Sequence, residues 1–348
     1  MATVQHRNIG ADVLRLLSML MVCVLHVNLR LGITEEFPNC LYEMVCIQAV
    51  NLFAMLTGYF YVEARWKICR YVNLWFQVAF YAVGLTLLGC TLKHFGVFTE
   101  YQPKVWKILL PVPFASGYWY FTSYTAVFLL IPFLNRLIRS LNCRELRTLF
   151  LVVVPLFSLM TCFNGSSCVY QHGCNVAWLT ALYVTGAYLR LYPLKWNRAA
   201  TCLVLMSSLA IQIILYATGT PHRVTLLGYA FPLVVLSSVC MFHLCLGMTI
   251  KSPKIARAVM YLSPLAFGVY LVHIHHFSWL VLQRVLGVLH HHVGDAWWFV
   301  PVLGFGIFAG SLCVDWCRAR LFSLLRVSAW ADRLAAVCPA WLKDMEKM

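Results

Sequence analysis

Apolar segments of bilayer-crossing length recur along the whole chain, and they leave few folds open to it. About 20 consecutive apolar residues span the hydrocarbon core as an α-helix, which satisfies its own backbone polar groups in lipid. We identify ten such segments: 11–30, 42–62, 73–92, 119–138, 148–163, 175–191, 200–217, 225–248, 260–283 and 298–322. The sequence therefore predicts an all-α polytopic integral membrane protein, and no break in composition divides residues 1–348 into more than one domain.

The composition argues against a soluble domain. Hydrophobic residues make up 61% of the 348 residues and charged residues 11%, whereas a soluble surface needs far more charge. A net charge of +15 would indicate nucleic-acid binding in a soluble protein. Here the basic residues lie in short loops between apolar segments, so we expect membrane lipid as a partner and no nucleic acid.

The basic residues are enriched in alternate loops, which indicates the orientation in the membrane. One set of loops, with the C-terminal tail, carries most of the Lys and Arg residues, whereas the other set holds Glu35, Glu36 and an uncharged loop around residue 168. This asymmetry predicts that both termini are cytoplasmic, as an even number of spans requires. The first segment contains Arg15 and is followed by no cleavage site, so we expect a retained helix and not a signal peptide.

Cysteine and histidine patterns give no metal site. The fifteen cysteines contain no CxxC pair and no zinc spacing, and most lie in apolar runs as packing residues. Cys162, Cys168 and Cys174 flank one hydrophilic loop and would form a disulfide only if that loop faces an oxidising space. The HIHH run at 273–276 offers no tetrahedral ligand set. We therefore expect no bound metal.

The first apolar segment carries ionisable residues that a simple span would avoid. Arg15 and His26 are eleven residues apart and lie on one helical stripe, about 16 Å apart by rise. Asp12 is one turn before Arg15 and can pair with it. A packing histidine with a snorkelling arginine is one interpretation. The other is a path, with a cation for an anionic ligand at the cytoplasmic mouth and a base deeper in the membrane.

Four segments resemble one family when they are taken in order. The pattern R-x4-D-x2-R-x10-H at residues 7–26 resembles the first-helix signature of the bacterial membrane acyltransferase-3 family, whose members O-acylate surface polysaccharides. The segments 51–62 (NLFAMLTGYFYV), 119–135 (WYFTSYTAVFLLIPFLN) and 263–277 (SPLAFGVYLVHIHHF) resemble later segments of that family. Thr57 stands where the family has serine, and a single Phe53 precedes Ala54.

The resemblance implies a membrane O-acyltransferase of the bacterial plasma membrane. Its donor would be acyl-CoA, most often acetyl-CoA, on the cytoplasmic side, and its acceptor a hydroxyl of a cell-surface glycan or lipid-linked sugar. We expect no additional soluble C-terminal domain. Phosphates of the donor need cations at the mouth, and the candidates are Arg7, Arg15, Arg65, Lys67 and Arg70. For the last three, simple positive-inside topology is the alternative.

We assign catalysis to His26, Arg15 and Asp12. His26 would act as general base or as a transient acyl carrier, and Asp12, about 21 Å away along the helix, would pair with Arg15. Candidates for lining the cavity or supporting the site are Asn51, Tyr59, Trp119, Tyr124, Tyr270 and His273. For His273, helix packing is an equally weighted alternative.

A transporter or flippase for a small anionic or amino-acid solute is the competing function. Such proteins carry broken helices at matched places in two inverted halves. The sequence displays no such pairing, so we favour the acyltransferase.

Overall fold

The structure, a computed structural model, describes residues 7–31, 39–103, 117–163, 173–219, 223–293 and 297–348. Every regular element in these ranges is a helix. The elements are α1 (Ile9–Leu31), α2 (Asn39–Cys46), α3 (Ala49–Tyr61), α4 (Ile68–His94), α6 (Trp119–Ser140), α7 (Cys143–Phe163), α8 (Val176–Leu191), α9 (Arg198–Thr218), α10 (Arg223–Leu226), α11 (Pro232–Leu246), α12 (Pro253–Leu262), the 3-10 turn η2 (Ser263–Leu265), α13 (Ala266–Ile274), α14 (His276–Val293), α15 (Phe299–Leu324), α16 (Val327–Ala336) and α17 (Ala340–Met345).

The described helices confirm the predicted class. Eight helical stretches are long and apolar enough to cross a membrane, and three shorter apolar helices accompany them among the described residues. The eight are Ile9–Leu31, Asn39–Tyr61, Ile68–His94, Trp119–Ser140, Cys143–Cys162, Arg198–Thr218, Pro253–Ile274 and Phe299–Leu324. The chain is therefore an all-α, multi-pass membrane protein.

Two predicted spans have the wrong bounds. The span predicted at 260–283 is two helices, because the chain turns at His275, whose backbone lies at φ −58° and ψ 137°. The ring of His275 stabilises this break: its Nδ1 accepts the amide of Phe277 (3.2 Å), and its Nε2 lies 3.2 Å from the hydroxyl of Thr86. The span predicted to begin at residue 225 begins at Pro232, since proline lacks the N–H that a helix interior requires.

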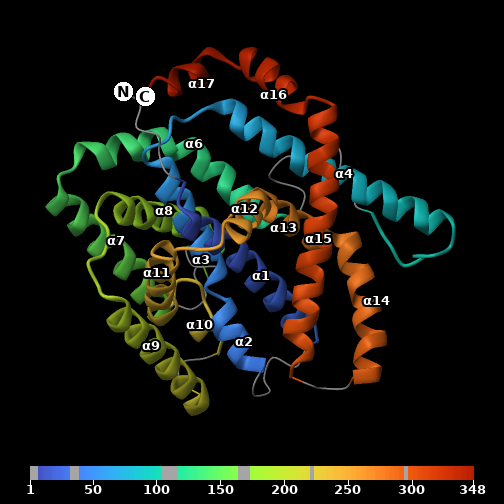
Figure 1. Ribbon diagram of the computed structural model, residues 1–348, viewed down its shortest axis with the longest axis horizontal. Helices are drawn as coiled ribbons and strands as arrows, with labels where there is room; N and C mark the ends of the chain where they lie inside the picture. Colours follow the sequence, from blue (N-terminus) through green and yellow to red (C-terminus); the bar gives the residue numbers. More distant parts are fainter. Residues whose placement is uncertain (1–6, 32–38, 104–116, 164–172, 220–222, 294–296) are drawn as a thin grey trace.

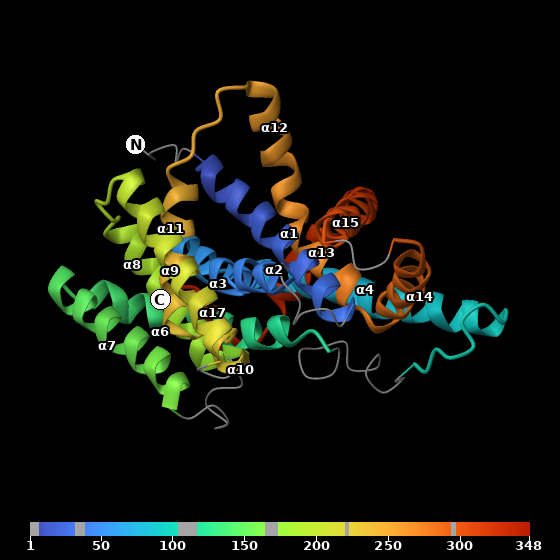
Figure 2. The ribbon, with the colours of Figure 1, turned by 90° about the horizontal axis from the view of Figure 1, so that it is seen from below.

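The site helices lie in the middle of the bundle. Figures 1 and 2 both place α1, α3 and α13 centrally, with α7 and α9 on one side and α14 and α15 on the other. The buried core is built largely from these central helices and α8. Side chains on α1 that face inward are therefore enclosed by protein.

Two glycines let α3 and α8 pack closely. A Cβ at Gly58 would overlap the carbonyl of Tyr183, and a Cβ at Gly186 would overlap the carbonyl of Met55. Small residues that allow backbones to touch are a usual means of helix association in membranes, where apolar surface alone gives little preference for protein over lipid. This contact fixes the position of α3, which carries Phe53.

A buried carboxylate joins α15 to α4 and α13. Asp315 is fully buried and accepts hydrogen bonds from Gln77 (3.1 Å), Tyr81 (2.8 Å) and, twice, Arg318 (2.9 and 2.7 Å). Gly268 on α13 lies so close that a Cβ there would overlap the Asp315 side chain. The network therefore holds the outer side of α13 in place.

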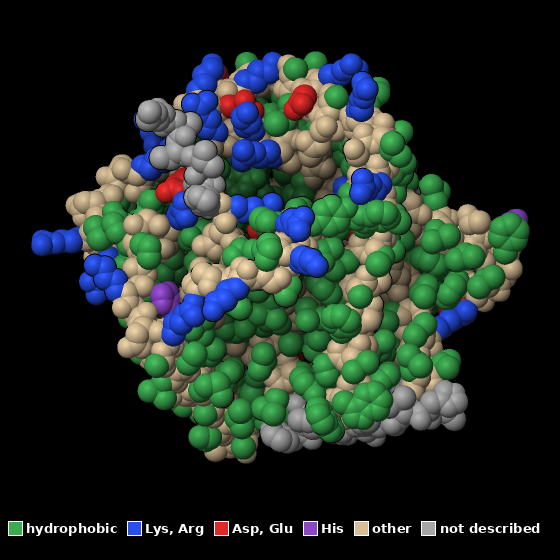
Figure 3. Space-filling model, viewed as in Figure 1, with side chains coloured by type: hydrophobic (Ala, Val, Ile, Leu, Met, Phe, Trp, Pro, Cys, Tyr) green, Lys and Arg blue, Asp and Glu red, His purple; other side chains and the backbone are tan. Residues whose placement is uncertain are grey.

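Basic side chains gather at one end of the bundle. On the face drawn in Figure 3, Lys and Arg crowd the upper part and are few in the lower part. The tail helices α16 and α17 run along this upper edge in Figure 1. Glu346 of the tail accepts the backbone N–H of Ile68 at the start of α4 (2.9 Å), and Arg139 donates to the carbonyl of Val62 (2.9 Å). These contacts bring together ends that the charge pattern predicts to be cytoplasmic.

Candidate active site

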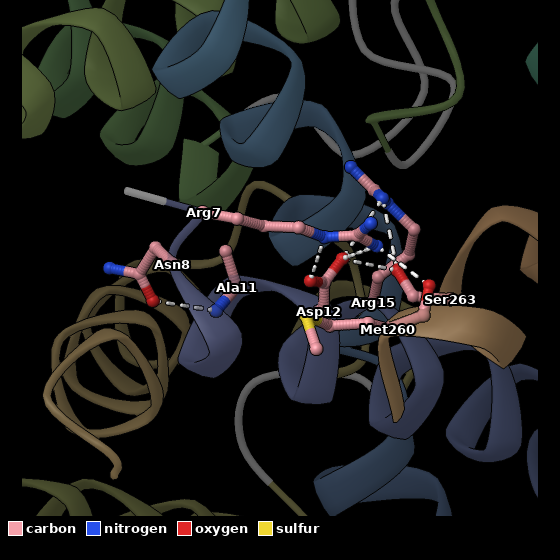
Figure 4. Close-up of polar contacts among 7 residues, drawn as sticks. All are labelled: Arg7, Asn8, Ala11, Asp12, Arg15, Met260 and Ser263. Carbon is pink, nitrogen blue, oxygen red and sulfur yellow. Dashed lines mark hydrogen bonds and ion pairs between the residues drawn. The ribbon is translucent and has the colours of Figure 1, made fainter. Parts of the chain in front are cut away.

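A carboxylate in the first turn of α1 gathers two arginines and a hydroxyl. Asp12 is 3% exposed and accepts from Nε and Nη2 of Arg7, at 2.6 and 3.0 Å. Ser263 Oγ donates to Oδ1 of the same carboxylate at 2.7 Å, and Arg15 Nη1 lies 3.6 Å from that oxygen. Figure 4 shows the two guanidinium groups and the hydroxyl round Asp12. One carboxylate thus faces two cations, which leaves a net positive charge.

The two arginines are held differently. Arg7 binds Asp12 through two nitrogens and also donates to the carbonyl of Met260 (2.8 Å). Its hydrogen bonds to Asp12 raise the pKa of the Arg7 guanidinium, although burial acts in the opposite direction. Arg15 donates one hydrogen bond, from Nη1 to Ser263 Oγ (3.0 Å), and lines a cavity of about 310 Å³. Of the two arginines, Arg15 is therefore the one that faces this cavity.

His26 lines a second, smaller cavity of about 40 Å³. The walls of this cavity come from α1, α3, α6 and α13 together with Tyr229, which precedes α11. Three aromatic side chains, Phe53, Tyr120 and Phe267, line both this cavity and the cavity at Arg15. The cation and the imidazole thus face two cavities that share one aromatic wall.

The ring of His26 contacts a second histidine. Its Nδ1 lies 3.1 Å from Nε2 of His273, and Nδ1 of His273 lies 2.6 Å from the carbonyl oxygen of Val269. His273 is 4% exposed. On another side, the ring of Trp279 meets His26 edge to face at 6.2 Å, and the guanidinium of Arg30 lies 3.4 Å from the centre of the indole.

The stretch from Ser263 to His273 runs alongside α1 and contacts it at both ends. Ser263 contacts Arg15 and Asp12, whereas His273 contacts His26. Arg15 and His26 are about 16 Å apart by helical rise. The ten-residue step from Ser263 covers a similar length because its 3-10 turn rises about 2.0 Å per residue. The two stretches are parallel and in register.

Comparison with protein families matches residues 8–316 to an acyltransferase domain, that of the acyltransferase-3 family. The chain belongs to this family. The match contains every site residue described above except Arg7, which precedes it, and it ends before α16 and α17. Comparisons with curated proteins and with solved structures find no significant match. The family match and the apolar helices together identify the protein as a membrane acyltransferase.

Three of the remaining predicted residues line the acyltransferase cavities. Trp119 and Tyr270 lie in the wall beside His26, and Tyr124 lies in the wall of the Arg15 cavity. Trp119 stacks on Tyr229, with ring centres 6.1 Å apart and planes at 24°. The hydroxyl of Tyr270 accepts the backbone N–H of Tyr120 at 3.4 Å.

The structure places Asn51 and Tyr59 away from these cavities. The amide of Asn51 donates to the carbonyl of Tyr229 (2.8 Å) and accepts from the indole of Trp178 (3.1 Å). The hydroxyl of Tyr59 accepts from Arg190 (3.1 Å). Both polar groups are thus engaged in helix-to-helix contacts, and neither residue is among those that line the described cavities.

The basic group after the third helix of the acyltransferase is exposed and separate from Arg15. Lys67 and Arg70 lie on the surface, and Arg65 lines another pocket, of about 460 Å³, with Arg139 and the tail residues 345–348. None of the three is among the residues that line the Arg15 cavity. The structure therefore does not bring the five predicted donor-binding cations to one place.

Sequence reasoning overlooked Ser263, Tyr120 and Trp279. Ser263 and Tyr120 stand inside segments that resemble the family, but their polar partners are distant in sequence. Of the cysteines that flank the loop around residue 168, Cys162 and Cys174 are free thiols, whereas Cys168 lies outside the described residues.

Proposed function

We propose that this acyltransferase moves an acetyl group from acetyl-CoA at the cytoplasmic face of a bacterial plasma membrane to a hydroxyl of a glycan or lipid-linked sugar. His26 acts as the general base. The observation that carries the proposal is the shared wall of Phe53, Tyr120 and Phe267 between the Arg15 and His26 cavities. A slim donor arm that passes these three side chains connects a cation at one end with an imidazole at the other.

Arg15 is the residue that receives the donor phosphates. The phosphates cannot enter hydrocarbon, so they stay at the mouth, where a guanidinium can bind them through two parallel hydrogen bonds. Arg7 is already committed to Asp12 through two hydrogen bonds, whereas Arg15 has a single bond to Ser263 and faces the larger cavity. Ser263 and Asp12 hold Arg15 in place. Asp12 carries one negative charge against the two positive charges of Arg7 and Arg15, so a net positive charge remains for the phosphates.

His26 promotes attack of the acceptor hydroxyl on the thioester carbonyl. The hydroxyl proton moves to the imidazole as the new carbon–oxygen bond forms, and the carbon–sulfur bond then breaks. The imidazolium returns its proton to the leaving thiolate, so CoA leaves as the thiol and His26 is regenerated.

Aromatic faces beside His26 favour a sugar as the acceptor. Trp119, Tyr229 and Tyr270 line the cavity, and the first two are stacked. Aromatic rings offer a large apolar face with a polar edge, which suits a ring that carries C–H groups on its faces and hydroxyls on its rim. This supports a glycan or lipid-linked sugar as the acceptor.

The test is label transfer in proteoliposomes that contain the purified protein, acetyl-labelled CoA and lipid-linked sugar or glycan fractions. His26→Gln should lower the rate by about 10²-fold or more, the usual effect of removing a general base. Arg15→Gln should raise KM for acetyl-CoA. Matched controls are His243→Gln, which changes a histidine bonded to the Trp196 carbonyl, and Arg257→Gln, which changes an exposed arginine on α12.

The controls decide the interpretation. Transfer that His26→Gln leaves unchanged, or that His243→Gln reduces equally, contradicts the role of His26. Solute uptake by the vesicles without transfer of label to any acceptor would instead favour the transporter.

A further inference from the structure

We propose that His273 is a positioning residue that fixes the tautomer of His26 and so makes Nε2 of His26 the base. The inference rests on the proposed function for its catalytic consequence, but the tautomer itself is a property of the resting protein. It follows from hydrogen-bond roles along three groups: the carbonyl of Val269, the ring of His273 and the ring of His26.

The carbonyl of Val269 fixes the ring of His273. A backbone carbonyl oxygen can only accept a hydrogen bond. Because Nδ1 of His273 lies 2.6 Å from this oxygen, Nδ1 must carry the proton. The only other polar atom that the structure gives as a contact of this nitrogen is the thiol sulfur of Cys23, at a much longer 4.0 Å. In a neutral ring, Nε2 of His273 is then the nitrogen with the lone pair.

The ring of His273 in turn fixes the ring of His26. The two nitrogens that meet, Nδ1 of His26 and Nε2 of His273, are 3.1 Å apart, the length of a normal hydrogen bond. Such a bond needs one donor and one acceptor, and His273 supplies the acceptor. Nδ1 of His26 must therefore donate, which leaves Nε2 of His26 without a proton.

Both rings are neutral at rest, as the argument requires. They lie within apolar helices, where an uncompensated charge is costly. The charged groups nearest along α1 are Arg15 and Arg30, both cations, and Arg30 stacks on Trp279 beside His26. Neighbouring positive charge disfavours an imidazolium.

The arrangement prepares His26 for proton transfer. Because Nδ1 of His26 bonds His273, Nε2 is the ring nitrogen that can accept a proton in the cavity lined by His26, Trp119 and Tyr270. When Nε2 takes the proton of the acceptor hydroxyl, the Nδ1–H bond to His273 becomes charge-assisted and therefore stronger. In a Ser-His-Asp triad, the carboxylate holds the histidine in the correct tautomer. Here neutral groups have that role: the carbonyl of Val269 orients His273, and His273 holds the tautomer of His26.

The experiment reads the tautomer directly. The full-length protein, labelled with ¹⁵N-histidine and reconstituted in liposomes, is studied by solid-state NMR, and the His26 signals are assigned by difference from His26→Asn. We expect a protonated Nδ1 and a bare Nε2. His273→Leu should remove the preference, whereas His273→Gln should keep it because its amide oxygen still accepts from Nδ1. Cys23→Ala is the control for a change beside His273 that leaves the chain of bonds intact.

Activity then tests the consequence. His273→Leu should lower kcat by about 10²-fold or more with an unchanged KM for acetyl-CoA, and His273→Gln should stay within about tenfold of wild type. A protonated Nε2 on His26 of the wild-type protein would overturn the proposal, as would wild-type kcat in His273→Leu. If the wild-type protein transfers no acetyl group, the proposed function fails, but the NMR result still decides the tautomer.

Discussion

Replacement of Ser263 by alanine should weaken donor binding without slowing the chemical step. The hydroxyl donates to Asp12 (2.7 Å) and accepts the only hydrogen bond that the structure gives to Arg15 (3.0 Å). Without it, Arg15 keeps a charge contact with Asp12 at 3.6 Å, which is too long for a hydrogen bond. The guanidinium, which also lies 5.4 Å from the centre of the Phe60 ring, is then less restrained and must be ordered again when the donor binds.

The magnitude follows from that ordering. Immobilising a side chain with many rotamers costs about 0.5–1.5 kcal/mol, so KM for acetyl-CoA should rise about 2–12-fold, since 1.4 kcal/mol is tenfold. The value of kcat should not change, because His26 lies about 16 Å from Arg15 along α1. Initial rates of label transfer over a range of acetyl-CoA concentrations measure both constants.

A matched serine and a double mutant make this prediction sharp. Ser252 also precedes a proline, but its side chain makes no capping bond, so Ser252→Ala should leave KM unchanged. In an Arg15→Gln background, Ser263→Ala should have no further effect on KM, because the two residues act as one unit. An unchanged KM in Ser263→Ala, or an equal rise in Ser252→Ala, would refute the reasoning.

Three further predictions concern the frame and the acceptor side. Asp315→Asn should destabilise the protein by about 3–5 kcal/mol because it leaves the guanidinium of Arg318, whose side chain is 12% exposed, without its carboxylate; an unchanged Tm in detergent would contradict this. Gly186→Ala should also lower Tm, since its methyl group meets the carbonyl of Met55, and an unshifted melting curve would show that α3 and α8 can separate freely. Trp119→Ala should raise KM for the acceptor about 2–12-fold through loss of an aromatic contact of about 0.5–1.5 kcal/mol. It should change KM for acetyl-CoA little, and Trp119→Phe should change neither constant much; equal effects on both substrates would place Trp119 outside the acceptor site.

The class of fold could be predicted from the sequence because apolar length is a local property. Each helix that crosses the bilayer needs a continuous run of mainly apolar residues in the sequence. The break at His275 was missed because a ring bonded to Thr86, almost 200 residues earlier in the chain, stabilises it. Nothing in the local run of apolar residues marks that contact. The start of α11 at Pro232 was locally visible, and the prediction gave the proline too little weight.

The candidate site was predictable only where helical periodicity brings residues together. Arg15 and His26 share a stripe of α1, so their common direction was visible in the sequence. The partners that complete them, Ser263 and His273, come from a helix some 250 residues later. Asn51 is a residue that the sequence wrongly suggested for the site. As a polar residue in an apolar span, it was expected to line or support the catalytic cavity. Its amide instead bonds Trp178 and the Tyr229 carbonyl, and only the folded structure reveals those partners.

The two ends at which α1 contacts the stretch from Ser263 to His273 determine which parts of the protein can move during turnover. If the two stretches slid or tilted against each other, they would break the Ser263 contacts, the His273 contact or both. The helix α1 itself sets the spacing between Arg15 and His26, and these contacts keep Ser263 and His273 beside them while a donor arm enters and leaves. Passage then depends on rotation of Phe53, Tyr120 and Phe267, the side chains common to both cavities. We therefore expect passage of the donor arm to require rotation of these side chains and no collective motion of the helices, which would take microseconds to milliseconds.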